Sequence, residues 1–92
     1  MSLSSKEERI MHDAIDRKLD LLRSNPKYGQ SIAKRLIPKK YKRKYHIDNL
    51  YRIELPFFWR MLYTLRDNKI EIIAFVLDIV DYKKYDKKFN YR

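Results

Sequence analysis

The stretch LYRIELPFFWRMLYTL, Leu50–Leu65, decides the fold, because its side chains alternate in character on both sides of one proline. A repeat of two residues is typical of a strand whose two faces have different surroundings. Pro56 has no backbone N–H to donate to a sheet, so the first strand ends there. We predict two antiparallel strands, near Asn49–Leu55 and at Trp59–Leu65, joined by a three-residue turn. The first strand points Tyr51, Ile53 and Leu55 to one face and Leu50, Arg52 and Glu54 to the other.

A three-residue turn fixes the pairing of these strands. It places Glu54 opposite Arg60 and Arg52 opposite Leu62, so three charged side chains share one face with Cβ atoms about 5–8 Å apart. Two interpretations are open. The charges form a cross-strand ion pair of ordinary structural value, or two guanidiniums beside a carboxylate grip a phosphodiester, for which the fork geometry of Arg is suited.

The residues after this pair predict a third strand. Arg66–Lys69 reads as a hairpin turn, since its Asp and Asn tolerate positive φ. The stretch Ile70–Val80 is almost entirely apolar, so we expect it to be the central strand, covered on both faces. From Asp81 the chain mixes aromatic and basic residues. We expect this tail to form either a short helix or a coil that packs against the sheet.

The residues before the pair predict two helices. Ser5 and Glu8 match a capping box at the start of a long amphipathic helix, which Pro26 ends. A shorter helix is expected at Gln30–Leu36, followed by a basic loop at Lys39–Lys44. The predicted fold class is α+β, with two N-terminal helices packed on one face of a small antiparallel sheet and the other face left for a partner.

Length and composition predict one domain spanning residues 1–92, with residues 1–4 disordered or a cloning remnant. The absence of cysteine excludes disulfides and thiolate metal sites. No apolar run is long enough to cross a bilayer and no signal peptide is visible, so we expect a cytoplasmic protein with no membrane contact. No P-loop, nucleophile elbow or zinc motif is present, and two lone histidines make a weak metal site, so neither a metal nor a cofactor is expected.

Positive charge is concentrated in two segments. The net charge is +10, and residues 34–44 hold seven Lys or Arg and no acid, while residues 82–92 hold five and one Asp. Such clustering suits a polyanion, because each cation on a phosphate releases a counterion. Nucleic acid, an acidic protein partner and a plain solubilising surface are the three interpretations. The nucleic-acid-binding candidates are Lys39, Lys40, Lys42, Arg43, Lys44, Tyr82, Lys84, Lys87 and Lys88.

The aromatic residues fall into two groups. Those at strand spacing are expected in the core. Phe57 and Phe58 at the turn, and the rings of the basic tail, are harder to bury and can stack on unpaired bases beside cations. Alternatively, the tail packs its rings on the sheet. The expected core aromatics are Tyr51, Trp59, Tyr63 and Phe75.

Three motifs, NLYRIEL, WRMLY and IEIIAFVLDIVDYKKY, resemble the RelE/ParE superfamily of toxins from prokaryotic toxin–antitoxin modules, in an archaeal-looking form. The resemblance covers residues 5–92. It implies either a RelE-like, metal-independent endoribonuclease that cleaves mRNA at the ribosome or a ParE-like inhibitor of DNA gyrase. It also implies a cognate antitoxin, a small, acidic, helix-rich protein that wraps the toxin. One departure is the lack of the strand that precedes the first helix in many members.

The resemblance also implies site residues. Arg60 matches the strand arginine of the family, and Arg52 the basic residue of the preceding strand. A second family lysine falls on Glu54, which reverses its charge. The cation of the closing segment falls near Lys83 or Lys84, and the closing tyrosine is Tyr85 or is replaced by Phe89. The implied catalytic set is Arg60, Arg52, Glu54, Lys83 and Tyr85.

The implied chemistry is attack of a ribose 2′-OH on the neighbouring phosphate. Glu54 would accept the proton, the two arginines would hold the phosphate, and Lys83 or Tyr85 would donate to the leaving oxygen. Tyr82 stands where the family often has His, which predicts a slow nuclease that depends on positioning by the ribosome. A non-nuclease gyrase inhibitor and a degenerate RNA- or protein-binding member remain the alternatives.

Overall fold

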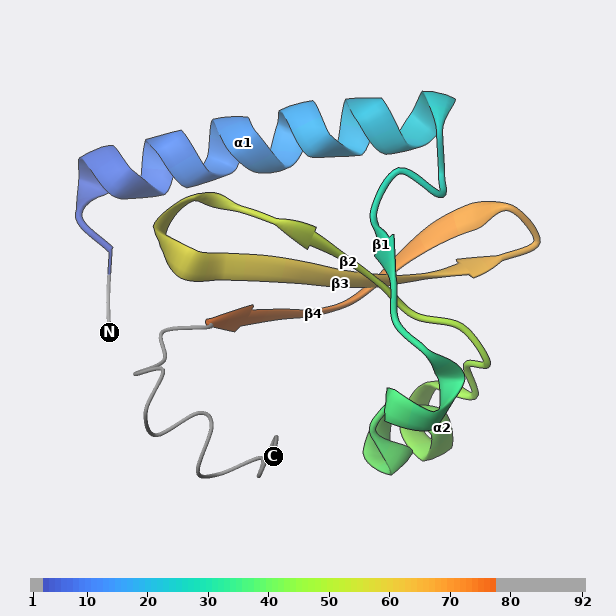
Figure 1. Ribbon diagram of the computed structural model, residues 1–92. Helices are drawn as coiled ribbons and strands as arrows, with labels where there is room; N and C mark the ends of the chain where they lie inside the picture. The colour runs from blue at the N-terminus through green and yellow to red at the C-terminus, as the bar shows by residue number, and fades with distance from the viewer. Residues whose placement is uncertain (1–2, 78–92) are drawn as a thin grey trace, which may run out of the picture.

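Four antiparallel strands in the order β1-β2-β3-β4 form one sheet between two helices (Figure 1). The computed structural model describes residues 3–77. The fold class is α+β, as predicted at this coarse level. The elements are α1 (Ser5–Ser24), β1 (Gln30–Ser31), the 3₁₀ turn η1 (Lys34–Leu36), α2 (Lys39–Tyr45), β2 (Tyr51–Glu54), the 3₁₀ turn η2 (Pro56–Phe58), β3 (Trp59–Arg66) and β4 (Lys69–Leu77).

The predicted pairing of the two decisive strands is confirmed. Glu54 lies opposite Arg60 and Arg52 lies opposite Leu62. The predicted hairpin after β3 is confirmed as well, because Asp67 has a φ of 55° and Asn68 a φ of 65°. Asp and Asn adopt such values at lower cost than other side chains, so the turn is encoded locally.

Helix α1 begins with a capping box one residue earlier than predicted. The Ser4 hydroxyl accepts from the Glu7 N–H at 3.2 Å, and the Glu7 carboxylate accepts from the Ser4 N–H at 2.9 Å. The sequence SSKEE contains two overlapping boxes, and spacing alone does not choose between them. The helix ends at Ser24 as predicted, with Asn25 as its C-cap before Pro26.

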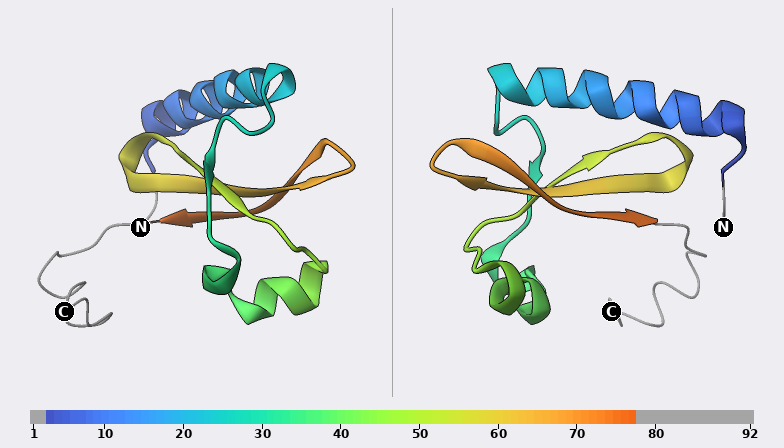
Figure 2. Two further views of the ribbon diagram at one scale, coloured as in Figure 1. Left: turned by 45° about the vertical axis from the view of Figure 1, so that its right-hand side comes forward. Right: turned by 180° about the vertical axis from the view of Figure 1, so that it is seen from behind.

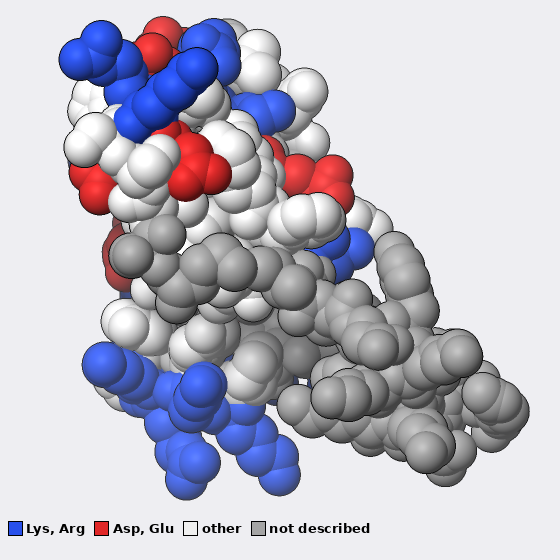
Figure 3. All heavy atoms as spheres, turned by 90° about the vertical axis from the view of Figure 1, so that its left-hand side faces the viewer, with Lys and Arg blue, Asp and Glu red and all other residues white. Residues whose placement is uncertain are grey.

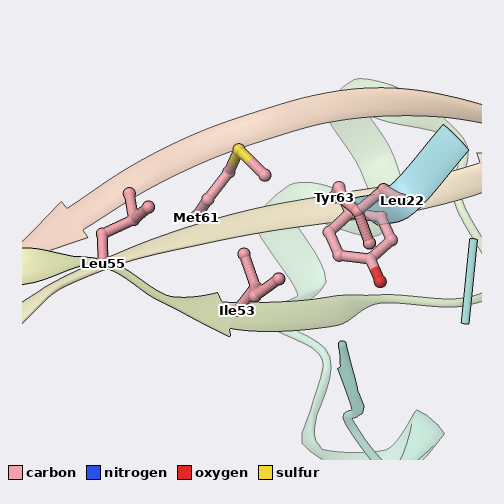
Figure 4. Packing of buried hydrophobic residues seen from close by; sticks show 5 residues of the cluster. All are labelled: Leu22, Ile53, Leu55, Met61 and Tyr63. Carbon is pink, nitrogen blue, oxygen red and sulfur yellow. The ribbon is translucent and has the colours of Figure 1, made fainter. Parts of the chain in front are cut away.

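The core on the α1 face of the sheet is built from the alternating residues of β2 and β3 (Figure 4). Tyr63 is its largest member and is fully buried. Its hydroxyl donates to the carbonyl of Pro26 and accepts from the N–H of Gly29, both at 2.9 Å, so the polar end of the ring is satisfied. The buried set is Leu22, Ile53, Leu55, Met61 and Tyr63.

The second helix lies where a loop was predicted. Residues Gln30–Leu36 form β1 and η1 rather than a helix, and the basic run folds as α2. Lys and Arg are good helix formers, and Pro38 fits the N-cap position directly before the first helical residue. Tyr41 and Tyr45, four residues apart, give α2 an apolar side.

Helix α2 lies on the opposite face of the sheet from α1 (Figures 1 and 2), so the prediction that both helices share one face is wrong. The face that was expected to remain free carries Leu50 and Leu62, which are apolar and need cover. The charged residues predicted on this face, Arg52, Glu54 and Arg60, lie beyond this apolar part. The buried cluster under α2 is Ile37, Ile47, Leu50, Leu62 and Ile73.

Strand β4 is an edge strand of the described sheet, and β3 is the one buried on both faces. Residues 61–64 of β3 are buried in succession, whereas Phe75 of β4 is 43% exposed. The predictions of a central third strand and of Phe75 as a core residue are therefore wrong. Apolar content did not identify the buried strand, because both strands carry polar residues, Arg60 and Thr64 in β3 and Lys69 and Glu71 in β4.

The other predicted core aromatics fit the structure better. Tyr51 and Trp59 are partly buried against the α1-face core, and Tyr51 stacks on Tyr63 with ring centroids 5.3 Å apart. Neither helix of residues 3–77 is long and apolar enough to cross a membrane. The end of the predicted third strand and the tail from Asp81 lie outside the described residues.

Candidate nucleic-acid interface

The Glu54–Arg60 pair occupies the end of the α2 face next to η2. Nη2 of Arg60 donates to Oε1 of Glu54 at 3.4 Å, which is long for a hydrogen bond. The Glu54 side chain is 79% exposed and that of Arg60 is 24% exposed. An exposed pair at this distance adds little to stability. The carboxylate can therefore exchange this contact for another donor at small cost.

Arg52 lies on the same face as Glu54 and Arg60, as predicted, but its guanidinium is held by a residue that the sequence did not point to. Nε and Nη2 of Arg52 donate to the side-chain oxygen of Gln30 at 3.0 and 2.8 Å. Gln30 lies directly opposite Arg52 in the pairing of β1 with β2. A neutral amide orients the guanidinium without cancelling its charge. Gln30 was missed because its segment was predicted to be a helix.

The basic residues of α2 form the second part of the candidate surface. All of them are exposed, and Figure 3 shows Lys and Arg side chains gathered at this end of the molecule, whereas both signs mix over α1. Nζ of Lys40 lies 5.4 Å from the ring centroid of Tyr41, and Nζ of Lys44 lies 5.4 Å from that of Tyr45. We call Lys39, Lys40, Lys42, Arg43 and Lys44 the basic helix surface.

A side chain of the β3–β4 hairpin fixes the end of α2. Nη2 of Arg66 donates to the backbone oxygen of Tyr45 at 2.8 Å, and the same guanidinium binds Glu71 at 3.1 and 3.2 Å. Cations at a helix C-terminus bind its unpaired carbonyls and oppose the negative end of its dipole. The basic helix surface is thus attached to the sheet that carries Arg52 and Arg60.

The turn η2 borders a cavity of about 290 Å³ next to the ion pair. The turn places two consecutive aromatic residues in the left-handed region, with a φ of 61° at Phe57 and 66° at Phe58. Phe58 is 70% exposed, in line with the expectation that this ring is hard to bury. The cavity is lined by Glu54, Leu55, Phe57, Phe58, Trp59 and Arg60.

The remaining candidates lie elsewhere or outside the described part. His12 is exposed on α1, 3.5 Å from Asp16, and His46 caps the C-terminus of α2 with a φ of 54°. Within residues 3–77, no group of three or more His, Cys, Asp or Glu is arranged to hold a metal ion. The candidates Tyr82, Lys83, Lys84, Tyr85, Lys87 and Lys88 lie outside the described residues.

Comparisons with known proteins add no relative to this picture: no family model, curated protein or solved structure matches the chain significantly. A functional interpretation therefore rests on the geometry of the α2 face and on the sequence motifs.

Proposed function

We propose that this protein is a RelE/ParE-like toxin that binds RNA on the α2 face and cleaves mRNA at the ribosome. One arrangement carries this function. Arg52, Glu54 and Arg60 share the sheet face that α2 also covers, so two guanidiniums, a carboxylate and the basic helix surface lie on one side of the molecule. Such a surface suits a phosphodiester chain that runs from the lysines toward the ion pair.

The reaction would be a transesterification within the RNA. The 2′-oxygen bonds to phosphorus while its proton passes to Glu54. The P–O5′ bond then breaks, and the leaving oxygen takes a proton from Lys83 or Tyr85, which lie outside the described residues. The products are a 2′,3′-cyclic phosphate and a 5′-hydroxyl. Arg52 and Arg60 would hold the phosphate oxygens on which charge develops.

The exposure of Glu54 limits the rate that this chain can reach alone. The Glu54 side chain is mostly exposed, and a carboxylate in water is a weak base near neutral pH. Much of the acceleration must therefore come from holding the 2′-OH in line with the phosphate. This requirement supports action on mRNA that the ribosome positions.

The experiment is induction of the protein in cells, followed by mapping of mRNA 5′ ends. We expect new 5′-hydroxyl ends with the native chain and a decrease of about 100- to 1,000-fold for Arg60→Ala, the size found when one charge-stabilising donor is removed. Arg17→Ala, an exposed arginine of α1, is the control and should cleave normally. Native cleavage by Arg60→Ala would refute the proposed site.

A protein partner would support the assignment to a toxin–antitoxin module. The gene next to this one should encode a short, acidic, helix-rich protein that co-purifies with the native chain and restores growth. Arg60→Ala should still bind it, because the proposed role of Arg60 is to hold the RNA phosphate. Failure of the encoded neighbour to bind would argue against a toxin–antitoxin pair.

A second candidate is a non-cleaving member of the same fold, an inhibitor of gyrase or a protein that binds RNA without cutting it. The hydrogen bonds from Arg52 to Gln30 favour it, because they occupy Nε and Nη2 of the guanidinium that would hold the phosphate. Growth arrest with intact mRNA and stalled DNA supercoiling would identify the gyrase inhibitor.

A further inference from the structure

The turn η2 holds bulky residues in a conformation that such residues avoid. Phe57 and Phe58 both have positive φ, which glycine adopts freely and which other side chains adopt at a cost. A strained backbone is retained where the surrounding structure or a function requires it. The Phe58 ring is mostly exposed, so packing within the described fold does not account for an aromatic residue at this position.

The cavity beside this turn is lined by residues of two kinds. Its lining combines the aromatic residues Phe57, Phe58 and Trp59 with the charged residues Glu54 and Arg60, which form an ion pair. A nucleotide has the same division, with a planar base and a charged sugar-phosphate. Rings that line a cavity next to a cation are the elements that single-strand-binding proteins use to hold bases and backbone together.

We propose that this cavity is a stacking site for one unpaired base of single-stranded RNA. This inference rests on the proposed function and deepens it, since it places the nucleotide next to the reacting phosphate. The base stacks on Phe58, and its phosphate lies toward Arg60. Every base has a π-face, so the site tolerates any sequence but requires a base that has left its duplex.

Trp59 provides a direct readout, because it lines the cavity and is the only tryptophan of the chain. The probes are a 2′-O-methyl hexa-adenylate, which the enzyme cannot cleave, an abasic strand with the same number of phosphates, and a duplex of equal length. We expect the hexa-adenylate to quench Trp59 fluorescence and the abasic strand and duplex to leave it nearly unchanged. Equal quenching by all three would overturn the inference.

Three substitutions separate stacking from folding. Phe58→Ala should weaken binding of the hexa-adenylate about tenfold, within the range for loss of one base–aromatic contact, and Phe58→Tyr should bind like the native chain. Phe58→Gly should bind as weakly as Phe58→Ala yet unfold at a higher temperature, because glycine relieves the positive φ. Tyr28→Ala is the matched control, since Tyr28 is an exposed aromatic outside the cavity lining.

The outcomes distinguish this inference from the proposed function. Native affinity in Phe58→Ala, with salt-dependent RNA binding retained, would overturn the stacking site and leave the toxin assignment standing. Loss of a protein partner rather than of RNA in Phe58→Ala would also overturn it and identify η2 as a protein contact. If the native chain binds none of the RNA probes, both the stacking site and the proposed RNA-binding function are refuted.

Discussion

The backbone N–H of Gly29 donates to the phenol oxygen of Tyr63 at 2.9 Å, across 34 residues of sequence. The same phenol donates to the carbonyl of Pro26, so one hydroxyl satisfies two backbone groups of the segment that leads from α1 into β1. That segment ends at Gln30, which orients Arg52. The central strand thus positions a residue of the candidate interface through a buried side chain.

Gly29→Ala should destabilise the protein, because an added Cβ would lie 2.6 Å from the Tyr63 oxygen and 2.8 Å from the Arg52 carbonyl oxygen. Neither neighbour can move freely, since one is a fully buried ring and the other is strand backbone. We expect a loss of about 1–3 kcal/mol in the free energy of unfolding, the usual cost of overpacking. Urea unfolding measures it, with exposed Ser31→Ala as the control. A loss no larger than that of the control would contradict the close packing.

Tyr63→Phe removes the same hydroxyl and should change how the stability of the protein depends on pH. Burial raises the pKa of the Tyr63 phenol above its ordinary value of 10.0, although the Gly29 N–H acts in the opposite direction. Between the two pKa values the unfolded chain binds fewer protons than the folded protein, so stability falls as pH rises through this range. The variant should lose about 1–3 kcal/mol near neutral pH, because two backbone groups lose their partner. Its stability should then decline less steeply than that of the native chain above pH 10.

Urea midpoints of both proteins from pH 8 to 11 provide the comparison. The other seven tyrosines are present in both chains, so their contribution cancels in the difference. Parallel curves above pH 10 would mean that the pKa of Tyr63 is not raised on folding.

The β2–β3 register could be predicted because local features set it. Pro56 ends one strand, and the alternation on either side fixes which residues face each other, so the Glu54–Arg60 pairing follows. The β3–β4 turn is local in the same sense, since Asp67 and Asn68 carry its conformation themselves.

The layer arrangement could not be predicted in this way, because it depends on contacts between distant residues. The helix at residues 39–45 is stabilised by the packing of Tyr41 and Tyr45 against Leu50 and Leu62. This apolar surface lies on the sheet face opposite α1, and its residues are distant in sequence from much of the cluster. The two-residue strand β1 has no periodicity to detect. The hydrogen bond from Arg52 to Gln30 could not be predicted for that reason.

Gln30 should affect RNA binding through Arg52, and two substitutions separate orientation from charge. Gln30→Met removes the acceptor but not the charge of Arg52. It should weaken RNA binding a few-fold with little change in the salt dependence. Gln30→Glu keeps an acceptor but pairs Arg52 with a carboxylate. It should lower the slope of log K against log salt by about 0.7, the value for one phosphate contact on a single strand.

The double variants with Arg52→Ala complete this test. If Gln30 acts through Arg52, each double variant should bind RNA like Arg52→Ala alone, since there is no guanidinium left to orient. Additive losses in the double variants would show that Gln30 touches the RNA itself or supports the fold.

The basic helix surface should bind RNA phosphates through Lys40 and Lys44, whose ammonium groups lie near the rings of Tyr41 and Tyr45. Replacing both lysines by Gln removes two charges while keeping similar helix propensity. We expect the slope of log K against log salt to fall by about 1.4, because two contacts with single-stranded phosphates are lost. The matched control is Lys6→Gln with Lys27→Gln, which removes the same charge from exposed positions outside α2. Titrations at several salt concentrations distinguish the pairs, and equal slopes would show that net charge rather than α2 attracts the RNA.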